Sequence, residues 1–151
     1  MALSFKNIAL LSFCLLATAA CFAAFVVFLM KPYRNYEASV WGLFSGVCAA
    51  LVLHLDYLHA RGRLSLWHSI ETLNRICDFG FVATVLGTAG FVWYIFLTLY
   101  YKTTVFPVGK STIIPAVWTM MTVKWGAAIM VICTKYRKYL RSLELLRDDP
   151  Q

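Results

Sequence analysis

The sequence predicts an all-α integral membrane protein with four transmembrane helices. Hydrophobic residues make up 61% of the 151 residues, and the mean hydropathy is +0.71. Charged residues make up only 14%, about half of the ~25% usual in soluble domains. These charges are clustered, so that long uncharged stretches separate them. A soluble domain would need more polar surface, and we therefore expect the lipid bilayer to surround most of the chain.

The first predicted span covers residues 8–30, which contain no charge. At ~1.5 Å per residue this run exceeds the ~30 Å hydrocarbon core of a bilayer. A cleaved signal peptide is the alternative, because residues 17–19 (Ala-Thr-Ala) resemble a cleavage site. The apolar run continues well beyond the usual ~7–15 residues of such a peptide, which favours a helix that stays in the protein.

The other predicted spans follow from the same hydropathy pattern. They cover residues 40–58, 76–101 and 113–132, and the charged segment 133–151 is expected to be a tail. Polar residues fill the connections, and Pro32 and Pro107 lie in two of them. There is no internal repeat, so residues 1–151 are interpreted as one membrane domain.

The basic residues predict the orientation. The N-terminus, the 59–75 connection and the tail share one side and hold nine Lys or Arg, whereas the other two connections hold four. Because cytosolic segments carry the excess of Lys and Arg, both termini are expected in the cytosol.

The sequence argues against several functional classes. It contains no GxGxxG, P-loop, HExxH or nucleophile elbow, so we expect no enzyme. The net charge of +7 comes from residues between the apolar runs and in the tail, which indicates topology and lipid headgroups rather than nucleic acid. The five cysteines form no CxxC and mostly lie inside apolar runs, so we expect them to be core or lipid-facing residues rather than disulfides or metal ligands. We expect no permanent cofactor.

His54 and Tyr57 are candidate ligand-binding residues on the second span. They lie three residues apart and therefore share one face of a helix. Both side chains can bind haem iron, and imidazole is the commoner axial ligand, which makes His54 the candidate iron ligand. The structural alternative is an interfacial Tyr57 with His54 bonded to a neighbouring helix. Asp56 lies on another side of this helix and is expected to reach the cytosolic interface.

Lys124 is the second candidate, because it lies near the middle of the fourth span between Trp118 and Trp125. A charged Lys at that depth costs a few kcal/mol unless it is paired or faces water. It could bind a carboxylate of a substrate, pair with Asp78, lose its proton, or make a structural contact between helices.

Two further patterns have simpler explanations available. Gly42 with Gly46, and Ala83 with Gly87, form small-xxx-small pairs that favour close helix packing or oligomerisation. The tail opens with alternating basic and aromatic residues, which suit the flat rings and anionic propionates of haem but are also typical of a membrane anchor. Its candidate haem contacts are Tyr136, Arg137, Lys138 and Tyr139.

Several motifs together resemble the haem-responsive gene (HRG) family of small haem transporters. In the fourth span they are Val117-Trp118, Lys124-Trp125 and, at a matching distance beyond, Tyr136-Arg137. In the second span, Gly46-Val47 and His54-x-x-Tyr57 are similar to that family's helix. The resemblance extends over roughly residues 25–147 and agrees with four spans and cytosolic termini.

The resemblance implies movement of haem into the cytosol from an acidic organelle or from outside the cell. It implies that His54 contacts haem in the second helix and that the tail contacts it at the exit. The family's tail has a motif of the F-A-R-K-Y kind, which this chain replaces with K-Y-R-K-Y. Many members carry a histidine in the second exoplasmic loop; residues 102–112 lack one, and Tyr100 and Tyr101 are the expected substitutes.

The resulting expectation is a haem transporter in the plasma membrane or an endosomal or lysosomal membrane, with haem as transported ligand. Because four short helices enclose little space for a porphyrin, we expect a homo-oligomer. A non-transporting membrane scaffold is the alternative. A di-haem cytochrome would need paired histidines at membrane depth, whereas only His54 is expected there.

Overall fold

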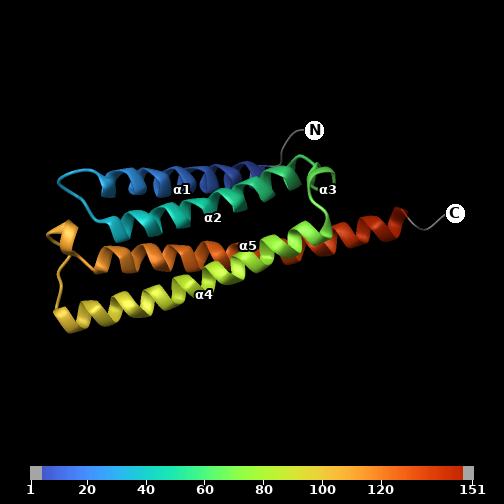
Figure 1. Cartoon of the computed structure of the whole chain (residues 1–151). Coiled ribbons are helices and arrows are strands. Elements are labelled where there is room, and N and C mark those ends of the chain that lie inside the picture. Colours follow the sequence, from blue (N-terminus) through green and yellow to red (C-terminus); the bar gives the residue numbers. More distant parts are fainter. Residues whose placement is uncertain (1–4, 148–151) are drawn as a thin grey trace.

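The computed structural model describes residues 5–147 and consists of helices joined by short connections (Figure 1). Its elements are α1 (Phe5–Leu29), α2 (Tyr36–Ala60), α3 (Leu64–Trp67), α4 (Ile70–Tyr101), the 3-10 turn η1 (Val108–Lys110) and α5 (Ile113–Arg147). Four of these helices are long and apolar enough to cross a membrane, and the described residues contain no strand. The predicted all-α, four-span fold class is confirmed.

α4 and α5 extend farthest beyond the predicted spans. α4 begins at Ile70 because the Ser69 side chain caps its first turn, accepting a hydrogen bond from the backbone N–H of Thr72 at 3.2 Å. α5 continues to Arg147, so most of the expected tail is helical. Its extension is amphipathic: Cys133, Tyr136 and Leu140 are buried on one face. Residues 148–151 of the predicted tail and the side chains of residues 6, 144, 146 and 147 lie outside the described part.

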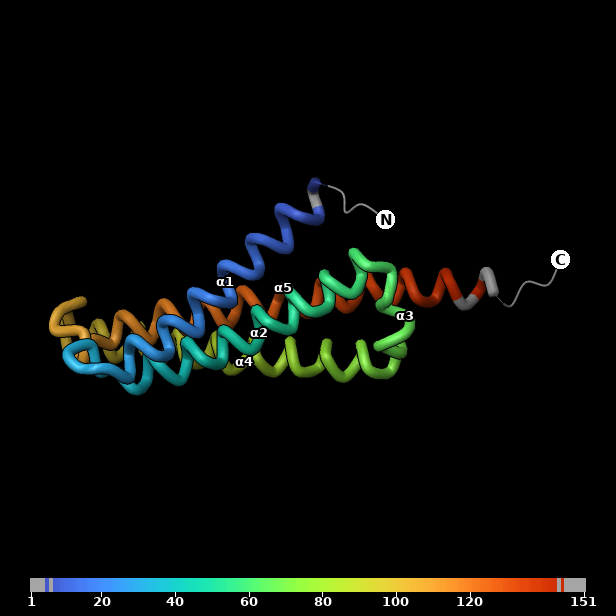
Figure 2. Tube along the Cα trace, turned by 90° about the horizontal axis from the view of Figure 1, so that it is seen from above, coloured from blue at the N-terminus to red at the C-terminus, as the bar shows by residue number. Residues whose placement is uncertain are grey.

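The long helices pack in the order α1, α2, α5, α4. The principal interfaces join α1 to α2, α2 to α5 and α4 to α5. The N-terminal half of α1 diverges from the other helices (Figure 2). The first residues of α1, the α2–α4 connection and the end of α5 lie towards one end of the bundle (Figure 1). The described ends of α1 and α5 therefore lie at the same end of the bundle, and the cytosolic location of both termini stays a prediction.

Glycines allow α4 and α5 to pack closely. A Cβ at Gly87 would lie 2.9 Å from Val123 Cγ2, and one at Gly80 would lie 2.8 Å from Ile129 Cγ2. Gly42 and Gly46 of α2 instead face α1, where a Cβ at Gly46 would lie 3.3 Å from Cys21 Cβ. The small-residue pairs predicted from the sequence therefore serve packing within the chain.

Asn35 connects two loops at the other end of the bundle. Its side-chain amide donates to the backbone carbonyls of Val108 at 2.9 Å and Ser111 at 3.0 Å. Its oxygen accepts from the backbone N–H of Ala38 and caps α2. This buried side chain holds the α1–α2 connection against the α4–α5 connection, which fixes the spacing of the helices at that end.

Candidate functional site

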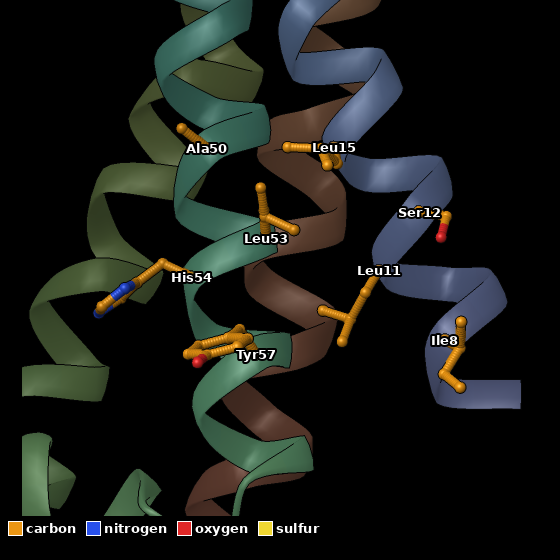
Figure 3. Close-up of a pocket in the computed structure, with 8 residues that line it drawn as sticks. All are labelled: Ile8, Leu11, Ser12, Leu15, Ala50, Leu53, His54 and Tyr57. Carbon is orange, nitrogen blue, oxygen red and sulfur yellow. The ribbon is translucent and has the colours of Figure 1, made fainter. Parts of the chain in front are cut away.

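A groove of about 530 Å³ lies between the diverging half of α1 and the C-terminal half of α2 (Figure 3). Its lining residues are Ile8, Leu11, Ser12 and Leu15 of α1 and Ala50, Leu53, His54 and Tyr57 of α2. The volume is within the ~300–1,000 Å³ of small-molecule sites, and a mostly apolar lining with a few polar groups is typical of them.

His54 and Tyr57 both line this groove, as their spacing on one helix face predicts. Leu11 and Leu53 lie between the two helices, while His54 and Tyr57 project from α2 at the edge of the groove, away from α1 (Figure 3). The guanidinium of Arg61 lies 5.5 Å from the centre of the Tyr57 ring. One edge of the groove therefore holds an imidazole, a phenol and a cation.

His54 has a second histidine as its neighbour. His68, which directly follows α3, places its Nε2 atom 3.3 Å from Nε2 of His54. The two rings are nearly perpendicular, with an interplanar angle of 89°. Burial, and then the positive charge that His54 can carry, lower the pKa of His68 below the usual value for histidine. This pKa shift favours an uncharged imidazole at position 68 near neutral pH.

Lys124 lies outside this groove. Its ammonium is 5.4 Å from the centre of the Phe13 ring of α1 and 5.0 Å from the ring of Trp125. Both distances permit cation–π attraction. Asp78 is exposed and forms no salt bridge among the described residues, where Arg75–Glu71 is the pair observed. Across the helix interface, the Lys124 ammonium therefore faces the ring of Phe13, and its binding of a substrate carboxylate stays a prediction.

The expectation that Asp56 reaches the interface is wrong. The side chain is only 6% exposed, and its Oδ1 accepts a 2.5 Å hydrogen bond from the hydroxyl of Tyr136, which is also buried. Oδ2 of Asp56 is buried without a hydrogen-bond partner in the described part of the chain. The ring of His59 stacks on Tyr136 with centroids 4.4 Å apart. Asp56 is covered by the helical extension of α5. The sequence predicted this extension to be a charged tail.

The four candidate tail residues divide into two pairs. Tyr136 binds Asp56, and Arg137 donates from Nη1 to Asn74 Oδ1 of α4 at 2.6 Å. Lys138 and Tyr139 are exposed. The first pair holds α5 against α2 and α4, and the second pair is accessible to a ligand.

Tyr100 and Tyr101 lie at the other end of the bundle, where both side chains are exposed. Tyr100 continues a stacked aromatic row along α4, with ring centroids 6.1 Å apart for Trp93–Phe96 and 5.9 Å apart for Phe96–Tyr100. The structure therefore places these tyrosines far along the bundle from His54, at the end formed by the two loops (Figure 1).

Sequence reasoning missed two residues beside the groove. Arg61 follows Tyr57 by four positions, a spacing that could have revealed the contact. No sequence signal could have revealed His68, because its approach to His54 depends on how the α2–α4 connection folds back.

Residues 74–125 match a family model described as haem-transporter, endosomal/lysosomal, haem-responsive gene (HRG). The resemblance to the HRG family is confirmed. The match covers about a third of the chain, comprising most of α4 and the part of α5 that ends with Lys124-Trp125. It does not include the groove residues of α1 and α2. No solved structure matches the chain.

The HRG match and the fold agree on the class of protein. The chain is a multi-pass membrane protein, and the description of the HRG family supports haem transport, with haem as the substrate. A transporter family is also consistent with the expectation that the chain is not an enzyme. The residues that contact haem and the oligomeric state stay predictions.

Proposed function

We propose that this HRG-like chain moves haem across an endosomal or lysosomal membrane into the cytosol, using the α1–α2 groove as a haem contact. The main observation in support is the groove itself, in which an apolar wall adjoins His54, Tyr57 and Arg61. An apolar wall suits the porphyrin, the imidazole suits its iron, and a guanidinium suits a propionate.

The proposed route has three stages. Haem meets Tyr100 or Tyr101 at the outer end, passes His54 and Lys124 at membrane depth, and leaves past Lys138 and Tyr139. Tyr136 and Arg137 support this route indirectly, since their hydrogen bonds hold α5 in place. Each contact must bind weakly enough to release haem to the next.

Growth of a haem-auxotrophic cell at low haem concentrations tests the proposal. Cells expressing the wild-type chain are expected to grow where control cells do not. Because the proposed location is an internal membrane, cytosolic haem should be measured alongside with a haem-responsive reporter. Absence of rescue and of reporter signal, despite a normal amount of protein in the membrane, would favour the scaffold alternative.

His54→Ala is expected to reduce haem-dependent growth and reporter signal. Loss of ~1.4 kcal/mol of binding free energy lowers affinity tenfold, so we expect haem transport to fall by about tenfold or more. His54→Tyr, which keeps an iron-ligating side chain, is the matched control and should retain more activity. Unchanged transport in His54→Ala would remove this residue from the route.

Lys124→Met is expected to change transport and stability in opposite directions. Removing a charge from membrane depth avoids a cost of about 2.5–3.5 kcal/mol, so thermal stability in detergent should be equal or higher. Haem transport should fall, because the cation expected to meet a propionate is gone. Lys124→Arg keeps the charge and should keep transport. If Lys124→Met transports normally, the contacts with Phe13 and Trp125 are structural only.

A further inference from the structure

The contact between His54 and His68 restricts what His54 can bind. The two Nε2 atoms are 3.3 Å apart, and between neutral imidazoles such a contact needs one N–H donor and one lone-pair acceptor. Whichever ring is the donor, Nε2 of His54 is occupied. If it donates, it carries a proton; if it accepts, its lone pair points at the proton of His68.

The surroundings of His68 favour one of these two arrangements. Its Nδ1 atom is buried and has no hydrogen-bond partner in the described part of the chain. A proton on Nδ1 would be a buried donor without an acceptor, which is costly. The proton of His68 therefore belongs on Nε2, from which it donates to Nε2 of His54. His54, whose side chain is exposed, then carries its proton on Nδ1, where water or lipid headgroups can accept it.

In this tautomer, Nε2 of His54 has the lone pair that a metal requires, but His68 covers it. A metal binds an imidazole nitrogen at ~2.0–2.1 Å along the lone-pair direction. The Nε2–H of His68 lies in that direction, so iron and His68 compete for the same lone pair. The two histidines cannot be axial ligands on opposite faces of one haem in this arrangement either, because that would separate the nitrogens by ~4 Å.

We propose that His68 is a release residue, which masks the iron-binding lone pair of His54 in the empty groove and competes with haem for it. The inference rests on the proposed function, in which His54 contacts haem iron. Haem displaces the His68 side chain on arrival, and the return of that side chain lowers the cost of haem leaving. A transporter needs such a device, because a fully open imidazole in an apolar groove would hold haem rather than pass it on.

The position of His68 suits this role. It lies between the four-residue helix α3 and Ser69, the N-cap of α4, in extended backbone. Its backbone N–H donates to the carbonyl of Leu64 at 2.9 Å, so the main chain is held while the imidazole approaches α2 from a separate element. The side chain can therefore leave and return without a change in either long helix.

Haemin titration of the purified chain, followed by the Soret absorbance, tests the proposal. His68→Ala is expected to tighten haemin binding by about threefold to tenfold. A tenfold change in affinity corresponds to ~1.4 kcal/mol, which is about the net contribution of one hydrogen bond. His68→Phe, which keeps a ring but no nitrogen, should show the same gain. His68→Gln, whose amide can still donate to Nε2 of His54, should bind as the wild type does. Equal or weaker binding in both His68→Ala and His68→Phe would overturn the proposal.

Two further measurements separate this proposal from the proposed function. His54→Ala and the double variant His54→Ala/His68→Ala should bind haemin equally weakly, because His68 acts only through His54. If His54→Ala binds as tightly as the wild type, the haem contact at His54 is wrong and the release role fails with it. Nitrogen NMR of the haem-free protein reads the tautomers directly: the expected result is Nε2–H for His68 and Nδ1–H for His54, and the reverse assignment would overturn the masking.

Discussion

Tyr136→Phe is expected to lower the free energy of unfolding by about 1–3 kcal/mol, the cost of leaving a buried polar group without its partner. The Tyr136 hydroxyl donates to Oδ1 of Asp56, and Oδ2 has no partner in the described part of the chain. The substitution would therefore leave the buried carboxyl group without any of its observed hydrogen bonds. Denaturant unfolding in detergent, followed by circular dichroism, measures the change.

Tyr139→Phe is the matched control for this experiment. Tyr139 lies on the same helix and also contacts His59, but its side chain is 41% exposed. Loss of its hydroxyl should change the free energy of unfolding by less than about 0.5 kcal/mol, as for other surface substitutions. Equal effects of the two substitutions would contradict the importance of the Asp56–Tyr136 bond.

A double substitution distinguishes the hydrogen bond from simple packing. Replacing both partners of a buried hydrogen bond with apolar groups of similar shape can be nearly neutral. Asp56→Leu/Tyr136→Phe should therefore recover much of the stability that Tyr136→Phe loses. A double variant less stable than Tyr136→Phe alone would show that the Asp56 side chain contributes through contacts other than the Tyr136 hydroxyl.

The apolar patterns were sufficient to predict the four spans, and one helical spacing was sufficient to bring His54 and Tyr57 to the same groove. Both depend on local regularity: a long uncharged run has few alternatives to a membrane helix, and residues three apart share a helix face. The position of the groove depends on the divergence of α1, which no sequence pattern indicates.

Asp56 shows why the remainder of the site could not be predicted. Its burial depends on α5 continuing as a helix through a segment rich in Lys and Arg, which by composition resembles a solvated tail. Within that segment Cys133, Tyr136 and Leu140 repeat at three and four residues and form the buried face. The helical period was present in the sequence, but the surrounding charges concealed it.

Gly126→Ala is expected to destabilise the chain by about 1–3 kcal/mol, the usual cost of inserting a methyl group into a tightly packed contact. A Cβ at Gly126 would lie 2.6 Å from Thr84 Oγ1 and 2.8 Å from the backbone carbonyl oxygen of Gly80. Thr84 cannot move freely, because its hydroxyl donates to that same carbonyl at 2.8 Å. The backbones of α4 and α5 would have to separate, which thermal unfolding in detergent should detect.

Gly42→Ala is the matched control, since it adds the same methyl group to a glycine in another helix interface. The Cβ would lie no closer than 3.5 Å to α1, which is ordinary contact. Replacing Gly with Ala inside a helix favours the helix by about 1 kcal/mol, so this variant should be as stable as the wild type or more stable. If both substitutions destabilise the chain equally, close packing of α4 against α5 is not the reason for glycine at position 126.

The same pair of variants also tests how packing supports transport. Gly126 directly follows Lys124-Trp125, whose side chains meet Phe13 of α1. Separation of α4 and α5 should shift this pair, so Gly126→Ala should reduce haem transport at temperatures where the protein is still folded. Gly42→Ala should transport as the wild type does. Normal transport by folded Gly126→Ala would show that the position of Lys124 tolerates movement of α5, and would count against a direct contact between Lys124 and haem.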